Sequence, residues 1–183
     1  MTYDIDICGM THTLPLCRLN DELYIGAFVI FGQVELTIHC ASELLKRMPA
    51  CDFLLAPEAK SIPLVYEMSR QSGIPYLLAR KKAKAYMQNI FEVRVQSITT
   101  AGEQTLVIDA ADAEAMRNKR VVILDDVIST GESLRATEAL AQKAGANIVG
   151  RLAILAEGAA AERDDIIYLR RLPLFRPDGT PIE

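Results

Sequence analysis

The sequence predicts an α/β fold in which a mainly parallel sheet is flanked by helices. Short aliphatic runs of strand length alternate with segments whose apolar residues recur at helical spacing. A parallel strand that is buried on both faces is a continuous aliphatic run, whereas a covering helix carries a single apolar stripe. The clearest case is residues 121–136, VVILDDVISTGESLRA, where a strand leads through small residues into a helix. Strand–helix–strand units of this kind predict a sheet covered on both faces.

The elements of this sheet are expected in the following order. Strands are expected at residues 24–31, 52–56, 75–80, 121–124 and 148–156. Helices are expected at residues 37–48, 61–72 and 133–144, and the last two are each followed by a glycine that favours a helix end. The first residues of the chain show no clear pattern and receive no assignment.

Two segments depart from the alternation. Residues 91–96 alternate apolar and polar side chains, and residues 104–109 follow across residues 101–102, which predicts a mobile antiparallel excursion. Residues 166–175, IIYLRRLPLF, have strand character but lie outside the strand–helix rhythm.

Composition excludes several classes of protein. The chain has 183 residues, enough for one domain with a full core, and its net charge of −4 offers no basic surface for nucleic acid. The four cysteines lack CxxC spacing and the two histidines form no metal motif, which argues against a zinc site and for reduced thiols. No apolar run is long enough to span a bilayer, and the acidic N-terminal residues do not resemble a signal peptide. We therefore expect a cytoplasmic protein with no nucleic acid or membrane partner.

The adjacent acids and the loop that follows them point to one ligand. The loop opens a helix, where free backbone N–H groups and glycine favour phosphate binding; its residues are Ser129, Thr130, Gly131, Glu132 and Ser133. Asp125 and Asp126 repel phosphate because carboxylates only accept hydrogen bonds, but they suit vicinal hydroxyls. A ribose 5-phosphate carries both groups. The alternative is that the two acids merely cap the helix.

The stretch VVILDDVISTGES resembles the phosphoribosyl-pyrophosphate (PRPP) motif of type I phosphoribosyltransferases, and most closely that of the adenine phosphoribosyltransferase group. A weaker resemblance extends over residues 52–157 and includes LLAPEAKSIPL and ARKKAK. It implies that Asp125 and Asp126 hold the ribose hydroxyls and that the loop holds the 5-phosphate.

The same resemblance implies a site for pyrophosphate. Its expected residues are Glu58, Ala59 and Lys60, with lysine in place of a family arginine, and the basic residues Arg80, Lys81 and Lys84. Cations in these places would accept the charge that develops on the leaving pyrophosphate. The alternative for the basic run is a solvated surface segment.

The resemblance further implies Mg²⁺ bound through PRPP, with no protein ligand assigned, and a homodimer. It also implies a single domain over residues 1–183, with a core at about residues 37–157. A small hood over the nucleobase would come from the N-terminal region and the C-terminal tail. Tyr24, Phe28 and Phe31 are candidates for stacking on the base, although aromatic residues in a strand usually belong to the core.

The chain departs from the adenine enzymes on the loop over the active site. Where they carry Ser-Leu-Glu-Tyr, this chain has Ser97, Ile98, Thr99 and Thr100, so the glutamate implicated in proton handling is absent. Glu103 is a candidate substitute, and the alternative is an exposed turn glutamate. Ser129 replaces the aspartate of hypoxanthine–guanine enzymes, which favours a purine enzyme of another type.

The predicted function is transfer of the 5-phosphoribosyl group from PRPP to a purine base, with adenine favoured, as in purine salvage. This activity is that of a pentosyltransferase and yields a nucleoside monophosphate and pyrophosphate. Two alternatives remain open. One is a PRPP- or nucleotide-sensing regulator without turnover, and the other is an α/β module for a different phosphorylated ligand.

Overall fold

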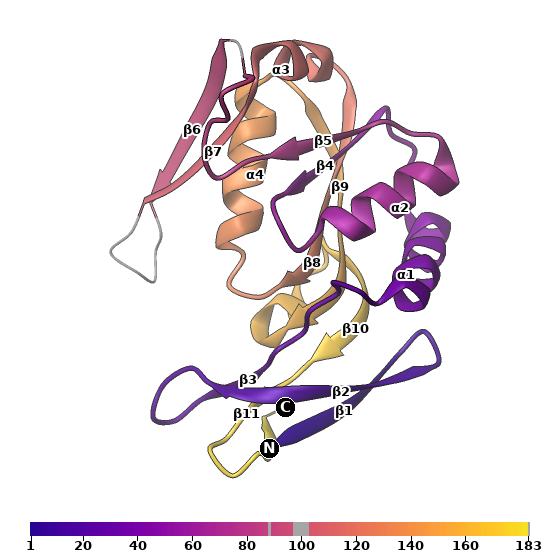
Figure 1. Cartoon of the computed structure of the whole chain (residues 1–183), viewed down its shortest axis with the longest axis vertical. Coiled ribbons are helices and arrows are strands. Elements are labelled where there is room, and N and C mark those ends of the chain that lie inside the picture. The colour runs from indigo at the N-terminus through magenta and orange to yellow at the C-terminus, as the bar shows by residue number, and fades with distance from the viewer. Residues whose placement is uncertain (88, 97–102, 183) are drawn as a thin grey trace.

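The computed structural model describes residues 1–87, 89–96 and 103–182. Within these residues the strands form a central five-stranded sheet, a second five-stranded sheet and a two-stranded sheet. Figure 1 shows the second sheet below the central one, with both chain termini in it.

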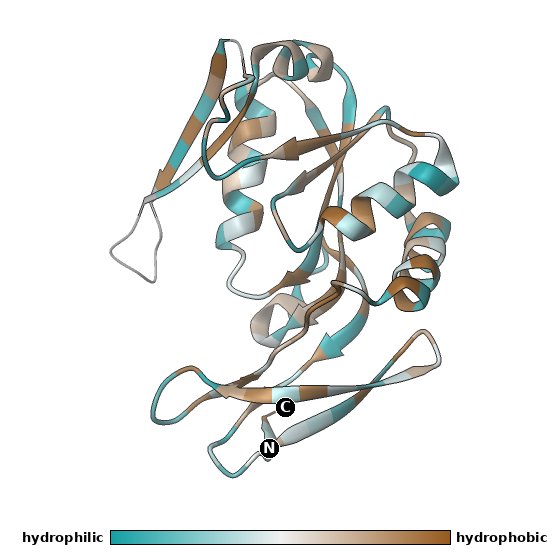
Figure 2. Ribbon diagram, in the orientation of Figure 1, coloured by the Kyte–Doolittle hydropathy of each residue, from teal (hydrophilic) through white to brown (hydrophobic). Residues whose placement is uncertain are grey.

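The central sheet is parallel throughout and has the order β10-β9-β8-β4-β5. Its strands in chain order are β4 (Phe53–Pro57), β5 (Tyr76–Ala79), β8 (Arg120–Ile128), β9 (Asn147–Glu157) and β10 (Ile167–Leu172). Figure 2 shows hydrophobic stretches along β4, β5, β8 and β9, as expected for strands covered on both faces, whereas the end of the edge strand β10 is hydrophilic. The predicted fold class is confirmed.

Helices cover both faces of this sheet. The helices α1 (Val34–Arg47) and α2 (Ile62–Ser72) pack into one buried cluster with Leu54 and Val122. The helix α4 (Glu132–Lys143) packs into a second buried cluster with Val121 and Ile123. Neighbouring residues of β8 thus contact different layers, because successive side chains of a strand point to opposite faces.

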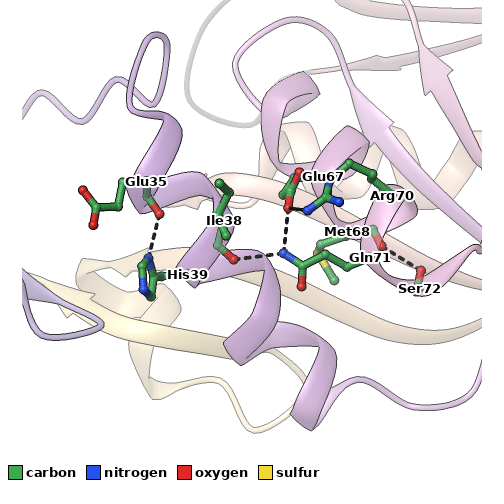
Figure 3. Close-up of polar contacts among 8 residues, drawn as sticks. All are labelled: Glu35, Ile38, His39, Glu67, Met68, Arg70, Gln71 and Ser72. Carbon is green, nitrogen blue, oxygen red and sulfur yellow. Dashed lines mark hydrogen bonds and ion pairs between the residues drawn. The ribbon is translucent and has the colours of Figure 1, made fainter.

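The two helices of the first layer are also joined by polar contacts. The Gln71 side chain on α2 donates to the carbonyl of Ile38 on α1, at 3.1 Å, and to Glu67, at 2.7 Å (Figure 3). Glu67 also accepts from Arg70 at 2.7 and 2.8 Å. The Glu67 carboxylate is buried but fully paired, which removes most of the cost of its burial.

The second sheet, which we call the hood, is antiparallel and has the order β1-β2-β3-β11-β12. Its strands are β1 (Thr2–Ile7), β2 (Met10–Arg18), β3 (Tyr24–Gly26), β11 (Leu174–Phe175) and β12 (Pro181–Ile182). The unassigned first residues therefore form strands. The expected exclusion of residues 166–175 from the strand–helix rhythm is wrong, because β10 joins the parallel sheet before the chain enters the hood at β11.

Three further expectations are corrected. The strand expected at residues 24–31 ends at Gly26, although Phe28 and Ile30 are buried beyond it. A side chain at Gly26 would meet Leu14 and Leu172, each at 3.3 Å, so glycine allows the hood to approach the core closely. The helix α3 (Ala110–Met116) was not expected. The strand β8 continues past residue 124 to Ile128 and contains both aspartates.

The antiparallel excursion consists of β6 (Ile90–Gln96) and β7 (Glu103–Asp109), which pair with each other. The connection expected at residues 101–102 lies outside the described residues. A backbone bridge between Arg80 and Val107 ties this pair to the end of β5. No helix in the described ranges has the length and apolarity needed to cross a membrane.

Candidate functional site

The candidate site lies along the carboxyl ends of β4, β8 and β9, which are neighbours in the parallel sheet. Ligands of open α/β sheets bind at this edge. The segment after β4 begins with Glu58, β8 carries Asp125 and Asp126 near its carboxyl end, and β9 ends at Glu157. The fold therefore brings together the expected ribose, phosphate and pyrophosphate residues from separate parts of the chain.

The two adjacent carboxylates are buried within β8. Asp125 is 8 % exposed and Asp126 is 2 % exposed. The Asp125 Oδ1 atom accepts from the backbone N–H of Asp126 at 2.9 Å. Burial, followed by the neighbouring charge of Asp126, raises the pKa of Asp125 to about 8. Helix-capping residues would lie at the start of α4, whose N-cap is instead Gly131, so the capping alternative is wrong.

One carboxylate oxygen retains capacity for a ligand. The Asp126 Oδ2 atom lies 3.1 Å from Lys60 Nζ, which gives an ion pair. The same oxygen is buried and has no hydrogen bond of good geometry among the described residues. The two findings agree if the lysine contact is mainly electrostatic, since an ammonium can lie close without pointing a hydrogen at the oxygen. A buried acceptor of this kind suits a hydroxyl donor.

The loop between β8 and α4 has the geometry expected of an anion-binding turn. Gly131 is buried with a φ of +77°, a conformation that favours glycine. A side chain at Gly131 would lie 3.3 Å from Nη1 of Arg163, so a guanidinium covers one side of the loop. Arg163 is held by Asp165, to which its Nε and Nη2 atoms each donate at 2.8 Å.

The basic residues expected at pyrophosphate fall into two groups. Arg80 is anchored, because its Nη1 atom lies 3.2 Å from Glu58 Oε2 and its guanidinium lies 5.8 Å from the ring centre of Tyr86. Glu58 also accepts from the backbone N–H of Lys81 at 2.9 Å, and the peptide bond between Glu58 and Ala59 is cis. Lys81 and Lys84 have exposed side chains, as a surface run would.

A cavity of about 420 Å³ lies between these basic residues and the loop. Its lining includes Lys81 and Lys82, together with Pro57 at the end of β4, Thr105 on β7 and Ser133 on α4. The cavity thus joins the expected pyrophosphate residues to the expected phosphate loop. Lysine side chains on one wall and a hydroxyl on the other suit an anionic ligand.

Glu157 is a site residue that the sequence reasoning did not include. It is 7 % exposed, and it follows Ala156, which pairs with Ile128 across the ladder. Glu157 accepts a hydrogen bond from the Ser129 side chain and is close enough to Lys60 for a favourable charge interaction. Burial raises the pKa of Glu157 above its ordinary value. The sequence did offer a signal for Glu157, because it directly follows the predicted strand 148–156, just as Asp125 directly follows the predicted strand 121–124.

The remaining candidates lie outside the described residues or belong to other parts of the fold. Thr99 and Thr100 lie outside the described residues, and so does the side chain of Glu103, although Glu103 begins β7. Phe28 is buried in the core cluster, in agreement with the core interpretation, whereas Phe31 is exposed.

Comparisons with known proteins agree with this arrangement. A model of the phosphoribosyl transferase domain matches residues 39–173. A hypoxanthine/guanine phosphoribosyltransferase of Methanococcus maripaludis is 35 % identical over 151 residues, which cover 80 % of this chain and 78 % of that protein. An adenine phosphoribosyltransferase of Rhodospirillum rubrum is 30 % identical over 115 residues, or 63 % of each chain. The chain spans about half the length of the first curated relatives it matches, such as an HGPRTase-like protein of Haloterrigena turkmenica, at 52 %.

Solved structures show the same fold. The crystal structure of an adenine phosphoribosyltransferase from Thermoanaerobacter pseudethanolicus has a TM-score of 0.65 and 20 % identity, and the match covers 78 % of this chain and 84 % of that one. An enzyme of Trypanosoma brucei, solved with AMP, pyrophosphate and ribose-5-phosphate, has a TM-score of 0.58 and 19 % identity, with coverage of 73 % and 62 %.

Proposed function

The chain belongs to the phosphoribosyltransferase family, and from this premise we propose that it transfers the 5-phosphoribosyl group of PRPP to a purine base. The products are a nucleoside monophosphate and pyrophosphate. One observation carries the proposal: a buried carboxylate pair precedes a loop whose glycine opens a helix, and a cavity lined by Lys81 and Lys82 extends from the end of β4 to the start of α4. These features match the hydroxyls, the 5-phosphate and the pyrophosphate of one molecule.

The ribose and its phosphate are assigned to β8 and the loop. Asp126 Oδ2 accepts from a ribose hydroxyl, for which it has a free acceptor position, and Asp125 contributes the second carboxylate. Backbone N–H groups at the start of α4 donate to the 5-phosphate, aided by the helix dipole. Both contacts fix the position of the anomeric carbon, so much of the catalysis comes from positioning.

The leaving pyrophosphate is assigned to the cationic residues at the other end of the cavity. Lys60 is paired with Asp126 at 3.1 Å, and Arg80 is paired with Glu58 at 3.2 Å. Preorganised cations stabilise charge that develops in the transition state, without a cost of reorganisation at that moment. Lys81 supplies a further charge from the wall of the cavity.

We assign Mg²⁺ to PRPP rather than to a protein cage. The described residues contain no group of three or more acidic, histidine or cysteine side chains that could hold a metal ion. Mg²⁺ usually keeps several waters and binds through substrate phosphates, and when bound it neutralises charge on the pyrophosphate. The buried Asp126 Oδ2 atom is the protein acceptor best placed to contact the hydrated ion or the ribose.

Adenine is the base we favour. Ser129 stands where hypoxanthine–guanine enzymes have an aspartate, so a recognition group of those enzymes is missing from the loop. Relatives named for adenine and for hypoxanthine and guanine both match this chain. The choice of adenine therefore rests on Ser129, and hypoxanthine or guanine is the second candidate.

The proposed homodimer would use an apolar surface on α1 and α2. Val34, Ile38 and Tyr66 are exposed there and line a pocket of about 220 Å³. Exposed apolar clusters of this kind mark association sites in soluble proteins. Light scattering on the Tyr66→Asp variant tests the assignment: a dimeric parent and a monomeric variant support it, and an unchanged dimer contradicts it.

Titration calorimetry tests the ligand assignment. We expect PRPP and AMP to bind, and Asp126→Asn to weaken both about tenfold to a hundredfold, because each loses a hydrogen bond to a charged acceptor worth roughly 1.5–3 kcal/mol. Asp178→Asn, an exposed acid in the hood region, is the matched control and should bind as the parent does. Unchanged binding by Asp126→Asn would show that the ribose lies elsewhere.

A sensing regulator remains the second candidate function because of one specific feature. The glutamate of the adenine enzymes is replaced by Thr99 and Thr100, so the known proton-handling group is missing. PRPP binding without nucleotide formation would favour this candidate.

A further inference from the structure

The reaction proposed above releases a proton, and no acceptor for it has yet been assigned. A purine nitrogen that carries hydrogen loses that hydrogen when it bonds to the anomeric carbon. Neither Thr99 nor Thr100 accepts a proton at neutral pH. Glu103 is a sequence candidate whose side chain lies outside the described residues, and among the described residues a carboxylate at the same edge of the sheet is the alternative acceptor.

The position of Glu157 meets the requirements for such an acceptor. It lies at the carboxyl end of β9, beside the loop that begins after Ile128, and it is hydrogen-bonded to Ser129 of that loop. It is also close enough to interact with Lys60, which is paired with Asp126. Glu157 thus lies at the edge of the sheet that carries the residues expected to bind the ribose, the 5-phosphate and the pyrophosphate.

Electrostatics limit what Glu157 can contact there. A carboxylate at this edge is not stabilised by the 5-phosphate or the pyrophosphate of a bound PRPP, because like charges repel. Its burial adds to the cost of keeping it charged. Only a hydrogen-bond donor or a positive centre can offset that cost. The reaction supplies both, as the N–H of the incoming base and as the oxocarbenium-like ribose.

We propose that Glu157 is a catalytic residue that accepts the proton of the attacking base nitrogen. The bond from this nitrogen to the anomeric carbon forms while the bond from that carbon to pyrophosphate oxygen breaks. The electron pair of the broken bond leaves with pyrophosphate, and the proton passes to a Glu157 carboxylate oxygen. The inference rests on the proposed function, because it requires turnover.

The neighbours of Glu157 support this role. Ser129 donates one hydrogen bond and so orients the carboxylate while leaving a second oxygen for the base. Burial raises the pKa of Glu157, which makes the carboxylate a stronger base than an exposed glutamate. Ser129 and Lys60 act in the opposite direction and lower the pKa of Glu157, because both stabilise the charged carboxylate.

The Glu157→Gln variant tests the proposal in turnover with Mg²⁺-PRPP and adenine. We expect kcat to fall about 10²- to 10⁴-fold, the usual contribution of a general base, while the Kd of PRPP stays within about twofold of the parent value or tightens, since a buried negative charge is lost. In the parent, kcat should decline as the pH falls through the pKa of the carboxyl group, and this decline should be absent in the variant. Glu162→Gln, an exposed acid on the turn after β9, is the matched control and should keep both kcat and pH profile.

Two further variants separate catalysis from support of the loop. Glu157→Asp keeps a carboxylate at shorter reach, and we expect a smaller loss of kcat with the pH dependence retained. Ser129→Asp in the Glu157→Gln background returns a carboxylate to the adjoining position, and part of the lost kcat should return. If Glu157→Gln does not fold, the Glu157→Asp variant tests the proposal alone. A lower kcat with the pH dependence retained supports the role of Glu157, and an unchanged kcat contradicts it.

The outcomes against the proposal are distinct. A parent that turns over, with a Glu157→Gln variant within threefold of its kcat, overturns the role of Glu157 alone. A parallel loss of kcat and PRPP affinity with an unchanged pH profile shows a merely structural role. A parent that forms no nucleotide with any base overturns the proposed function, and the role of Glu157 with it.

Discussion

Replacing Asp125 by asparagine is expected to stabilise the ligand-free protein while weakening its ligand binding. Asparagine has nearly the same shape, and its side-chain oxygen still accepts from the backbone N–H of Asp126, as Asp125 does at 2.9 Å. Because its pKa is about 8, Asp125 is mostly protonated at pH 7 in the folded protein and ionised in the unfolded one, so the substitution removes the cost of taking up this proton. Lys60 keeps its ion pair with Asp126 at 3.1 Å and its charge interaction with Glu157.

The magnitude follows from the pKa of Asp125, which burial and then Asp126 raise to about 8. One pKa unit corresponds to about 1.36 kcal/mol, and that pKa already includes the effects of Lys60 and of the backbone hydrogen bond. Because the buried asparagine amide also costs free energy, we expect a net gain of about 1–3 kcal/mol at pH 7. For a chain of this size each kcal/mol moves Tm by about 2–4 °C, so Tm should rise by roughly 2–12 °C.

The pH dependence has a definite sign. The folded state holds the Asp125 proton to higher pH than the unfolded state does, because the folded pKa is raised. Between about pH 4 and pH 8 the parent therefore loses stability from this group as pH rises. The Asp125→Asn variant lacks this loss, so its advantage should be small near pH 4 and largest near pH 8.

Calorimetric unfolding of both proteins without ligand, from pH 4 to pH 8, measures this difference. Glu162→Gln is the control, because its carboxyl group is exposed and pairs with Arg171 at the surface. A variant that is no more stable than the parent at pH 8, or whose advantage does not grow with pH, would refute the assignment of a buried charge cost to Asp125.

Three further predictions concern ligands. Arg80→Ala and Lys84→Ala should each weaken PRPP binding more than AMP binding, since AMP lacks pyrophosphate; calorimetry showing equal losses would remove both residues from that site. Gly131→Val should abolish binding of ribose 5-phosphate but retain any affinity for free adenine, because a β-carbon at a φ of +77° is strained and meets Arg163 Nη1 at 3.3 Å; retained phosphate affinity would contradict the loop assignment. Lys60→Met should lower the affinity for pyrophosphate and destabilise the folded protein at pH 7 by about 1 kcal/mol, because Asp126 loses the one ion pair that it makes among the described residues; unfolding in urea checks the second effect, and an unchanged midpoint would count against it.

Sequence patterns were sufficient for β4, β5, β8 and β9 of the central sheet because these strands contain continuous aliphatic runs, but not for β10, which carries Arg170 and Arg171. They were less informative for the hood. Ile5 and Ile7 are buried while Asp4 and Asp6 are exposed, so β1 has the two-residue alternation of a half-buried strand, although no element was assigned there. At residues 27–30 a strand was predicted where none forms, since Phe28 and Ile30 are buried without belonging to a strand. Hydropathy reports burial, and burial alone does not specify hydrogen bonding between strands.

The site shows a similar division. Asp125, Asp126 and the loop are contiguous, so one motif was enough to predict that they lie together. Glu157 comes from the next strand, and its contact with Ser129 depends on the register of β8 against β9. That register cannot be read from one sequence. The burial that raises the pKa of Asp125 and of Glu157 is likewise a property of the folded packing.

Release of pyrophosphate from Mg²⁺-PRPP with each of six bases tests the central proposal most directly. The panel comprises adenine, hypoxanthine, guanine, xanthine, uracil and orotate, with formation of the matching nucleotide measured in the same samples. We expect release that depends on a purine, with adenine the best substrate and the two pyrimidines inactive. Binding of PRPP with no nucleotide from any base would contradict the enzyme assignment and favour a PRPP sensor, and failure to bind PRPP would contradict the ligand itself.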